Sequence, residues 1–233
     1  AKYDIGLRPR TATGEPMPDE THKLVAWMGM PGRVLGGMDR TSDPSSSYGS
    51  YRFSPELNAI EGVPIPIWSS KSFVARWHGE EAPRVRVDLK STAGGVPEGS
   101  ITNNLPTPLD NGLFAYGRWA FSLGKVAPGE SVRIDHRSVH RELRDELTGR
   151  RSERDEKSDK IRDYRREYDE NSSDVPSILQ QMMFYEAAGG LTYTHLYHRY
   201  QPFTDLSRQL ELDRGILIGF VDERGGELVT TPE

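Results

Sequence analysis

Two pairs of histidines are the residues whose spacing could do chemistry. His136 and His140 are four positions apart and follow Asp135, while His195 and His198 are three apart in a tyrosine-rich stretch. Residues three or four apart share one face of a helix, an arrangement that suits zinc ligands. Spaced histidines more often form local hydrogen bonds. We therefore predict no metal and no cofactor, and the four histidines are metal candidates only if both pairs meet in space.

Sequence motifs for phosphate binding and nucleophilic catalysis are missing. The glycine-rich segment 29–37 (GMPGRVLGG) leads into a serine-rich loop rather than the Lys-Ser/Thr and helix of a phosphate loop. No serine lies in a Gly-x-Ser-x-Gly elbow. The chain has no cysteine, which excludes disulfides, thiolate zinc sites and thiol nucleophiles. We predict no catalytic residues and favour a protein that is not an enzyme.

An aromatic cluster offers the second kind of chemistry. Phe114, Tyr116, Trp119 and Phe121 could stack on sugars, which would make the chain a carbohydrate-binding or carbohydrate-processing module. The side chains alternate within each half of the cluster, as the core face of a sheet requires, and aromatic residues are large contributors to such cores. We favour the core interpretation and keep the carbohydrate module as the alternative.

The composition indicates a domain rich in short strands. Gly and Pro number 23 and 16 of 233 residues, and these residues punctuate strands and break helices. The net charge of −5 argues against a nucleic-acid partner, which would favour a basic face. The sequence contains no apolar run of the roughly 20 residues that cross a bilayer. Any membrane contact is therefore expected through an anchor outside this chain.

Alternating polar and apolar residues predict an antiparallel β-sandwich, Ig-like or jelly-roll-like, in one domain over 1–233. The polar, turn-rich residues 1–22 are expected to form an extended arm. The main sandwich is expected over 73–135, with Trp77, Leu89, Trp119 and Phe121 in its core. The strand segments are 23–30, 73–77, 85–89, 100–105, 113–123, with a bulge at Gly117, 131–135 and 215–221.

A charged helical insertion is predicted over 138–190. Residues 141–170 contain ten basic and eleven acidic side chains. Their few apolar residues are three or four positions apart within each of two groups, as on one face of a helix. We expect this segment to project from the sandwich and to dock on a partner through Leu143, Leu147, Ile161, Tyr164 and Tyr168. A packed C-terminal helix follows, with Asp174 as its cap, Pro176 in its first turn and Gly189-Gly190 at its end. Its Ile178, Leu179, Met182 and Met183 face is expected to pack on the sandwich.

Three segments carry a resemblance to a known group of proteins. They are 63–77 (VPIPIWSSKSFVARW), 99–129, which contains SITNNLPTPL and YGRW, and 178–219, which contains ILQQMMFYEAAGG and GILIG. Their pattern and order resemble the extracytoplasmic region of uncharacterised membrane-anchored proteins of planctomycete-type bacteria, over roughly 24–222. The resemblance implies a periplasmic or cell-surface domain tethered to the membrane. It carries over no functional residues.

Together these features predict a non-enzymatic interaction or assembly domain of a bacterial envelope protein. Its partner would be another envelope protein or a second copy of the chain.

Overall fold

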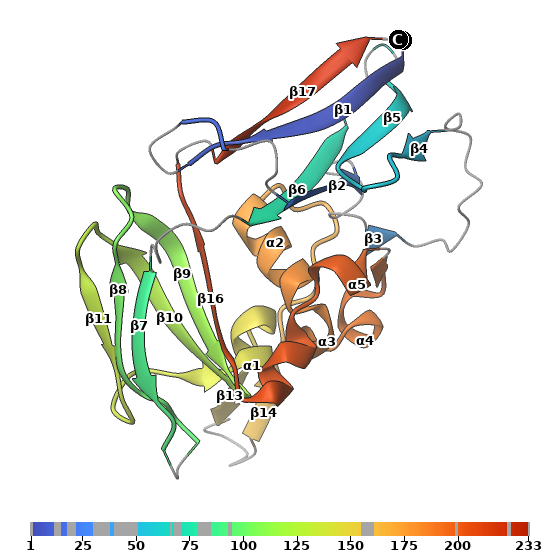
Figure 1. Cartoon of the computed structure of the whole chain (residues 1–233). Coiled ribbons are helices and arrows are strands. Elements are labelled where there is room, and N and C mark those ends of the chain that lie inside the picture. The colour runs from blue at the N-terminus through green and yellow to red at the C-terminus, as the bar shows by residue number, and fades with distance from the viewer. Residues whose placement is uncertain are drawn as a thin grey trace.

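The fold was analysed in a computed structural model of the chain, which describes residues 2–11, 15–17, 22–29, 38–39, 51–65, 67, 71–78, 85–92, 95–154, 161–198, 200–222 and 225–232. The protein is mainly β, with several antiparallel sheets and a few short helices, as the sequence predicts. Figure 1 shows three regions: stacked sheets on one side, a group of helices beside them, and a further sheet above both.

Two sheets form the sandwich-like region. One has the order β11-β8-β7, from β11 (Ser131–Ile134), β8 (Glu98–Asn103) and β7 (Val85–Lys90). The other has the order β12-β10-β9-β16, from β12 (Arg141–Glu142), β10 (Trp119–Val126), β9 (Leu109–Tyr116) and β16 (Gly215–Phe220). Ile101 and Ile134 from the first sheet pack with Phe114 and Phe121 from the second. The sandwich prediction is therefore confirmed at this level.

Residues 113–115 of β9 and 120–121 of β10 are buried on both faces. Successive side chains of a strand point to opposite sides, so Phe114 and Phe121 face the sandwich while their neighbours Leu113, Ala115 and Ala120 face the helices. The predicted single strand over 113–123 is in fact a hairpin, because Gly117 adopts a left-handed φ of 54° in a two-residue turn. The double burial makes β9 and β10 the central layer of the molecule.

The helices cover the second face of that layer. They are α1 (Leu143–Thr148), α2 (Val175–Met183), α3 (Tyr185–Ala188), α4 (Leu191–Thr194), α5 (Gln201–Thr204) and the 3₁₀ segment η1 (Ser207–Leu212). Asp174 caps α2 by accepting a hydrogen bond from the Ser177 amide, as predicted. The single predicted helix is interrupted at Phe184, so Gly189 ends the separate short helix α3 in a left-handed conformation. The predicted packing of α2 on the sandwich is wrong for Ile178 and Met182, which pack on Met38, Tyr185 and Leu196. Met183 packs against the cluster that includes Leu113 and Ala115 of β9 and Ala120 of β10.

The charged segment does not form the predicted helices beyond α1. β13 (Arg151–Arg154) and β14 (Ile161–Tyr164) pair as an antiparallel hairpin instead. Residues 155–160, which supply part of the predicted helical pattern, lie outside the described residues. Polar contacts between the strands stabilise this hairpin in place of apolar ones. Arg150 and Ser152 both contact the Asp163 carboxylate.

The N-terminal residues belong to a third sheet. Its order is β17-β1-β5-β4, from β17 (Gly226–Pro232), β1 (Lys2–Pro9), β5 (Ala59–Pro64) and β4 (Arg52–Phe53). The predicted arm is wrong for Lys2–Pro9, because β1 pairs on both sides and buries Ile5 and Leu7. β2 (His22–Gly29) pairs with β6 (Ser72–His78) beside this sheet, so Trp77 joins the N-terminal core rather than the sandwich. β3 (Met38–Asp39) pairs with β15 (Tyr197–His198).

Candidate functional site

The four candidate histidines lie in separate local environments. His136 lies 3.2 Å from Glu98 through Nδ1, and the Nδ1 of His140 lies 2.8 Å from the Ser138 carbonyl oxygen. His195 is exposed in a left-handed conformation after α4, whereas His198 is buried against Thr204. In the part of the chain that the structure describes, no group of three or more histidine or carboxylate side chains could hold a metal ion.

The predicted interaction stripe does not form one surface. Leu143 and Leu147 are 2% and 5% exposed, because α1 buries them against β9, β10 and α3. Ile161 and Tyr164 are exposed on β14, and Tyr168 is partly buried between two core clusters. The prediction that all five residues dock on a partner is therefore wrong for Leu143 and Leu147, which are core residues.

The aromatic cluster is mostly engaged within the fold. Phe114 and Phe121 are buried in the sandwich core. Trp119 is half-buried, with the Arg118 guanidinium 4.5 Å from the centre of its ring and His140 against its edge. The Tyr116 hydroxyl contacts Asp213, and this hydrogen bond raises the pKa of Tyr116. These contacts leave no open row of rings for a sugar, as the core interpretation of the cluster predicts.

An apolar groove lies where the N-terminal strands meet the C-terminal helical region. It has a volume of about 160 Å³. Its exposed members include Phe53, Leu57 and Phe203, which are 37%, 40% and 48% exposed. We call it the apolar groove, and its lining residues are Leu24, Val25, Phe53, Leu57, Val74, Arg76, Tyr200, Phe203 and Thr204. Exposed aromatic side chains gathered around one hollow are typical of contact surfaces.

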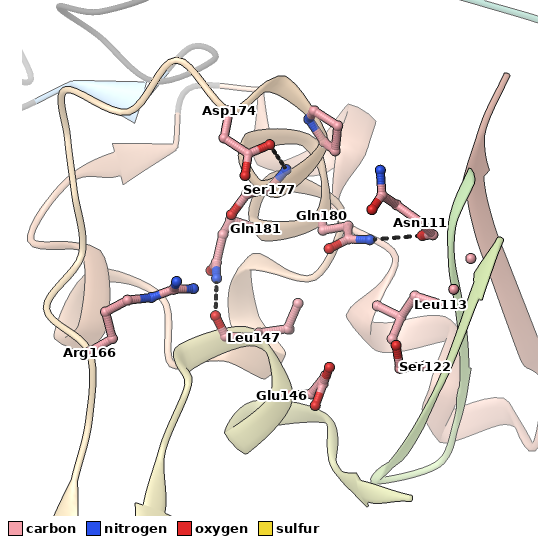
Figure 2. A pocket seen from close by; sticks show the side chains of 13 residues that line it. Asn111, Leu113, Ser122, Glu146, Leu147, Arg166, Asp174, Ser177, Gln180 and Gln181 are labelled. Carbon is pink, nitrogen blue, oxygen red and sulfur yellow. Dashed lines mark hydrogen bonds between the residues drawn. The ribbon is translucent and has the colours of Figure 1, made fainter. Parts of the chain in front are cut away.

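A polar pocket lies between the central sheet and the helices. It has a volume of about 250 Å³, and Figure 2 shows α2 on one side, α1 below and the strands β9 and β10 on the other side. Gln180 donates a hydrogen bond from Nε2 to the Asn111 carbonyl oxygen at 3.3 Å, which ties α2 to β9 across the pocket. The lining residues are Asn111, Gly112, Leu113, Ser122, Gly124, Glu146, Leu147, Arg166, Asp174, Pro176, Ser177, Gln180 and Gln181.

The sheet is irregular where it meets the polar pocket. The register of β9 and β10 shifts on both sides of Gly124, and Asn111 has a left-handed φ of 49°. A side chain at Gly112 would lie 3.2 Å from the Gly124 carbonyl oxygen, so the two backbones approach closely here. Bulges of this kind re-aim side chains and are frequent beside binding sites.

Comparison with known families places the pocket in a recognised domain. Residues 84–226 match a family model described as Domain of unknown function (DUF8725). The chain belongs to this family. The DUF8725 match begins just before β7 and reaches the start of β17, so it includes the sandwich, the helices and every residue of the polar pocket. No curated protein and no solved structure matches the chain.

The two carboxylates that line the DUF8725 pocket have partners within the fold. Glu146 pairs with Arg141 at 3.4 Å, and Asp174 accepts the Ser177 amide at 3.2 Å. Burial raises the pKa of the Tyr193 hydroxyl, and the positive charges of Arg166 and Arg165 partly oppose that effect. The lining of the pocket is therefore mostly polar, with two carboxylates that are engaged within the fold.

Sequence reasoning recognised only part of these two sites. Asp174 and Pro176 were identified as the start of a helix, but nothing in the sequence links them to Ser122 or Glu146 across the pocket. The Asn111-Gly112 dipeptide within a strand pattern is a signal for irregular backbone that could have located the bulge. The apolar groove joins residues nearly 180 positions apart, from Leu24 to Phe203, which no local pattern reveals.

Proposed function

We propose that the protein is a non-enzymatic interaction or assembly domain of a membrane-anchored bacterial envelope protein, and that the apolar groove is its contact surface. The observation that carries this proposal is the exposure of Phe53, Leu57 and Phe203 around one hollow. Burying a phenylalanine or leucine side chain contributes roughly 1.5–3 kcal/mol. Three such side chains in one place form the kind of anchor set that dominates protein–protein affinity.

The chemistry of the groove indicates its occupant. Arg76 is the only charged residue among the described residues that line it, and its side chain is exposed on β6. A partner segment that places apolar side chains in the hollow and a carboxylate beside Arg76 would complement both features. We commit to a different protein that carries such a segment.

Placement outside the cytoplasm rests on the resemblance to extracytoplasmic regions of membrane-anchored proteins. Among the described residues no helix is long and apolar enough to cross a membrane. The proposal therefore assigns the tether to a segment outside these 233 residues. The test uses cells of the producing bacterium in which the outer membrane is permeabilised and the inner membrane is intact. A protease added to these cells should digest the domain. Protection until the inner membrane is also opened would place it in the cytoplasm and refute this half of the proposal.

Site-specific photo-crosslinking tests the groove. A photoreactive phenylalanine analogue at Phe203 in the full-length protein, expressed in its own cells, should capture one defined envelope protein. Leu212 is a matched control, because it is 64% exposed and lies outside the groove. Arg76→Glu should weaken the Phe203 crosslink because it reverses the charge that receives the carboxylate.

Each outcome of that experiment bears on the proposal. A crosslink of the same partner from Leu212 would show that the groove is not the contact surface. A second copy of the chain as the only crosslinked product would overturn the choice of a different protein. If the analogue at Phe203 gave no crosslinked product while the analogue at Leu212 did, the contact surface would lie outside the groove.

A further inference from the structure

The polar pocket contains an unmet hydrogen-bond acceptor. Gln181 lies in its wall and is 5% exposed. Its Nε2 donates to the Leu147 carbonyl oxygen at 2.5 Å, which fixes the orientation of the amide (Figure 2). The other atom, Oε1, is buried and has no hydrogen-bond partner among the described residues. A buried acceptor without a donor costs roughly 1–3 kcal/mol of free energy, so a ligand hydroxyl that donates to Oε1 would offset that cost.

The size of the pocket sets the size of the ligand. Its 250 Å³ is far more than the roughly 30 Å³ that one water occupies in the liquid. It falls below the range of roughly 300–1,000 Å³ that is usual for drug-sized ligands. A molecule of monosaccharide size fits between these limits.

The engaged carboxylates disfavour a cationic ligand. Glu146 already pairs with Arg141, and Asp174 already accepts the Ser177 amide, so a cation would have to compete with these partners. Apart from Arg166, the remaining polar side chains are hydroxyls and amides, which are provided by Ser122, Ser177, Asn111 and Gln180. Hydroxyl groups both donate and accept, so they match a mixed lining of this kind better than a purely donating or accepting group does.

We infer that the polar pocket binds a small neutral polyhydroxylated molecule of monosaccharide size. One ligand hydroxyl donates to the Gln181 Oε1, and further hydroxyls bond to Ser122 and the amides across the pocket. The site differs from the aromatic platform that the sequence suggested, because no aromatic side chain is among the described residues that line it. The inference is independent of the apolar groove, which lies on other elements.

Calorimetry and saturation-transfer NMR on the intact chain test this inference. The probes are glucose, galactose, mannose and N-acetylglucosamine, with glycine as a zwitterion and inorganic phosphate as an anion. We expect saturable binding of at least one sugar with a Kd of about 1 mM or tighter. Ser122→Leu, which fills the pocket from β10, should weaken that binding at least about tenfold, as should Gln181→Met, which removes the acceptor.

A matched variant separates the site from general effects. Ser131 is an exposed strand residue on β11, outside the pocket, and Ser131→Leu should leave sugar binding unchanged. Gln181→Met also removes the hydrogen bond to Leu147 and could destabilise α2. If Gln181→Met fails to fold, the sugar binding of Ser122→Leu alone tests the inference. Absence of sugar binding, binding of glycine or phosphate alone, or equal sugar binding by wild type and Ser122→Leu would overturn the inference.

Discussion

At the residue scale, Asn103 shows how one polar side chain holds a connection between strands. It is 1% exposed at the end of β8. Its Nδ2 donates to the carbonyl oxygens of Thr107 and Val126, and its Oδ1 accepts the Leu105 amide at 3.0 Å. Every polar atom of the amide is therefore used, which is how a buried amide is tolerated.

Replacing Asn103 by alanine should destabilise the protein by about 2–4 kcal/mol, because three buried or partly buried backbone groups lose their partner together. The free energy of unfolding in urea measures the change. Asn104→Ala is the matched control, since that side chain is exposed and should change stability by less than about 0.5 kcal/mol. Equal effects of the two substitutions would contradict the role assigned to Asn103.

His198 makes stability depend on pH. Burial lowers its pKa from 6.5 to about 4, against smaller opposing effects of Asp205 and the Met182 backbone. The unfolded chain therefore binds the proton more readily than the folded chain does below pH 6.5. The contribution of neutral His198 is complete above pH 6.5 and is lost as pH falls toward 4. A shift of this size corresponds to about 3 kcal/mol across that window.

Thermal unfolding between pH 7 and pH 4 checks this expectation. Carboxylates also titrate near the lower limit, so the informative quantity is the difference between wild type and His198→Gln. The variant should lose stability at pH 7 and show a flatter decline on acidification. His136 is exposed on the surface, and His136→Gln should retain the wild-type slope. A wild-type slope in His198→Gln would rule out the assignment.

At the element scale, the charged segment shows where pattern reasoning fails. Its few apolar residues fit helical spacing, yet residues 151–154 and 161–164 pair as strands. The described side chains of both strands are exposed. Because neither face of the hairpin is buried, its sequence lacks the alternation of polar and apolar residues that identifies a strand. Helix α1, by contrast, was predicted correctly as helical and incorrectly as exposed, because spacing does not tell which surface an apolar pair contacts.

The hairpin and α1 should therefore differ sharply in their contribution to stability. The Arg166 amide donates to the Thr148 carbonyl oxygen, so the two ends of the hairpin segment lie close together. Replacing residues 151–164 by three glycine and serine residues should change the free energy of unfolding by less than about 1 kcal/mol. Leu147→Ala should cost about 2–5 kcal/mol, because its side chain is buried in the core.

Chemical denaturation of both variants provides the comparison. The replaced segment must leave out Thr148 and Tyr168. Thr148 is fully buried, and Tyr168 packs against two core clusters, so removing either would disturb the core. Unfolding of the domain by the hairpin replacement would show that β13 and β14 stabilise the core. A negligible effect of Leu147→Ala would contradict the packing of α1.

At the scale of the whole molecule, local patterns predicted the β class and most of the longer strands but not their partners. Alternation at 85–89 and 131–135 identified strands that the structure confirms as β7 and β11. The N-terminal sheet escaped prediction because its centre is β1, which pairs with β17 at the opposite end of the chain. Both sites were missed for the same reason, since each is assembled from elements whose proximity is a property of the tertiary fold.

The four core clusters suggest that the molecule has two separately stabilised parts. The N-terminal cluster contains Ile5, Leu7, Val25, Ile60 and Val63, and it shares no residue with the clusters of the sandwich and the helices. The DUF8725 match covers the latter region and leaves β1–β6 outside it. Local opening of the N-terminal sheet should therefore occur without unfolding of the family domain.

Ile5→Asp tests this division. Ile5 is fully buried at the centre of β1, opposite Ile60 on β5 and Thr230 on β17, so a carboxylate there has no stabilising partner in an apolar core. Hydrogen exchange measured by mass spectrometry should show lost protection in β1, β5 and β17 but wild-type protection in β8, β9 and β10. Lys2→Asp, at an exposed position of the same strand, is the control and should leave all six strands protected. Simultaneous loss of protection in both regions would show that the N-terminal sheet and the family domain unfold as one cooperative unit.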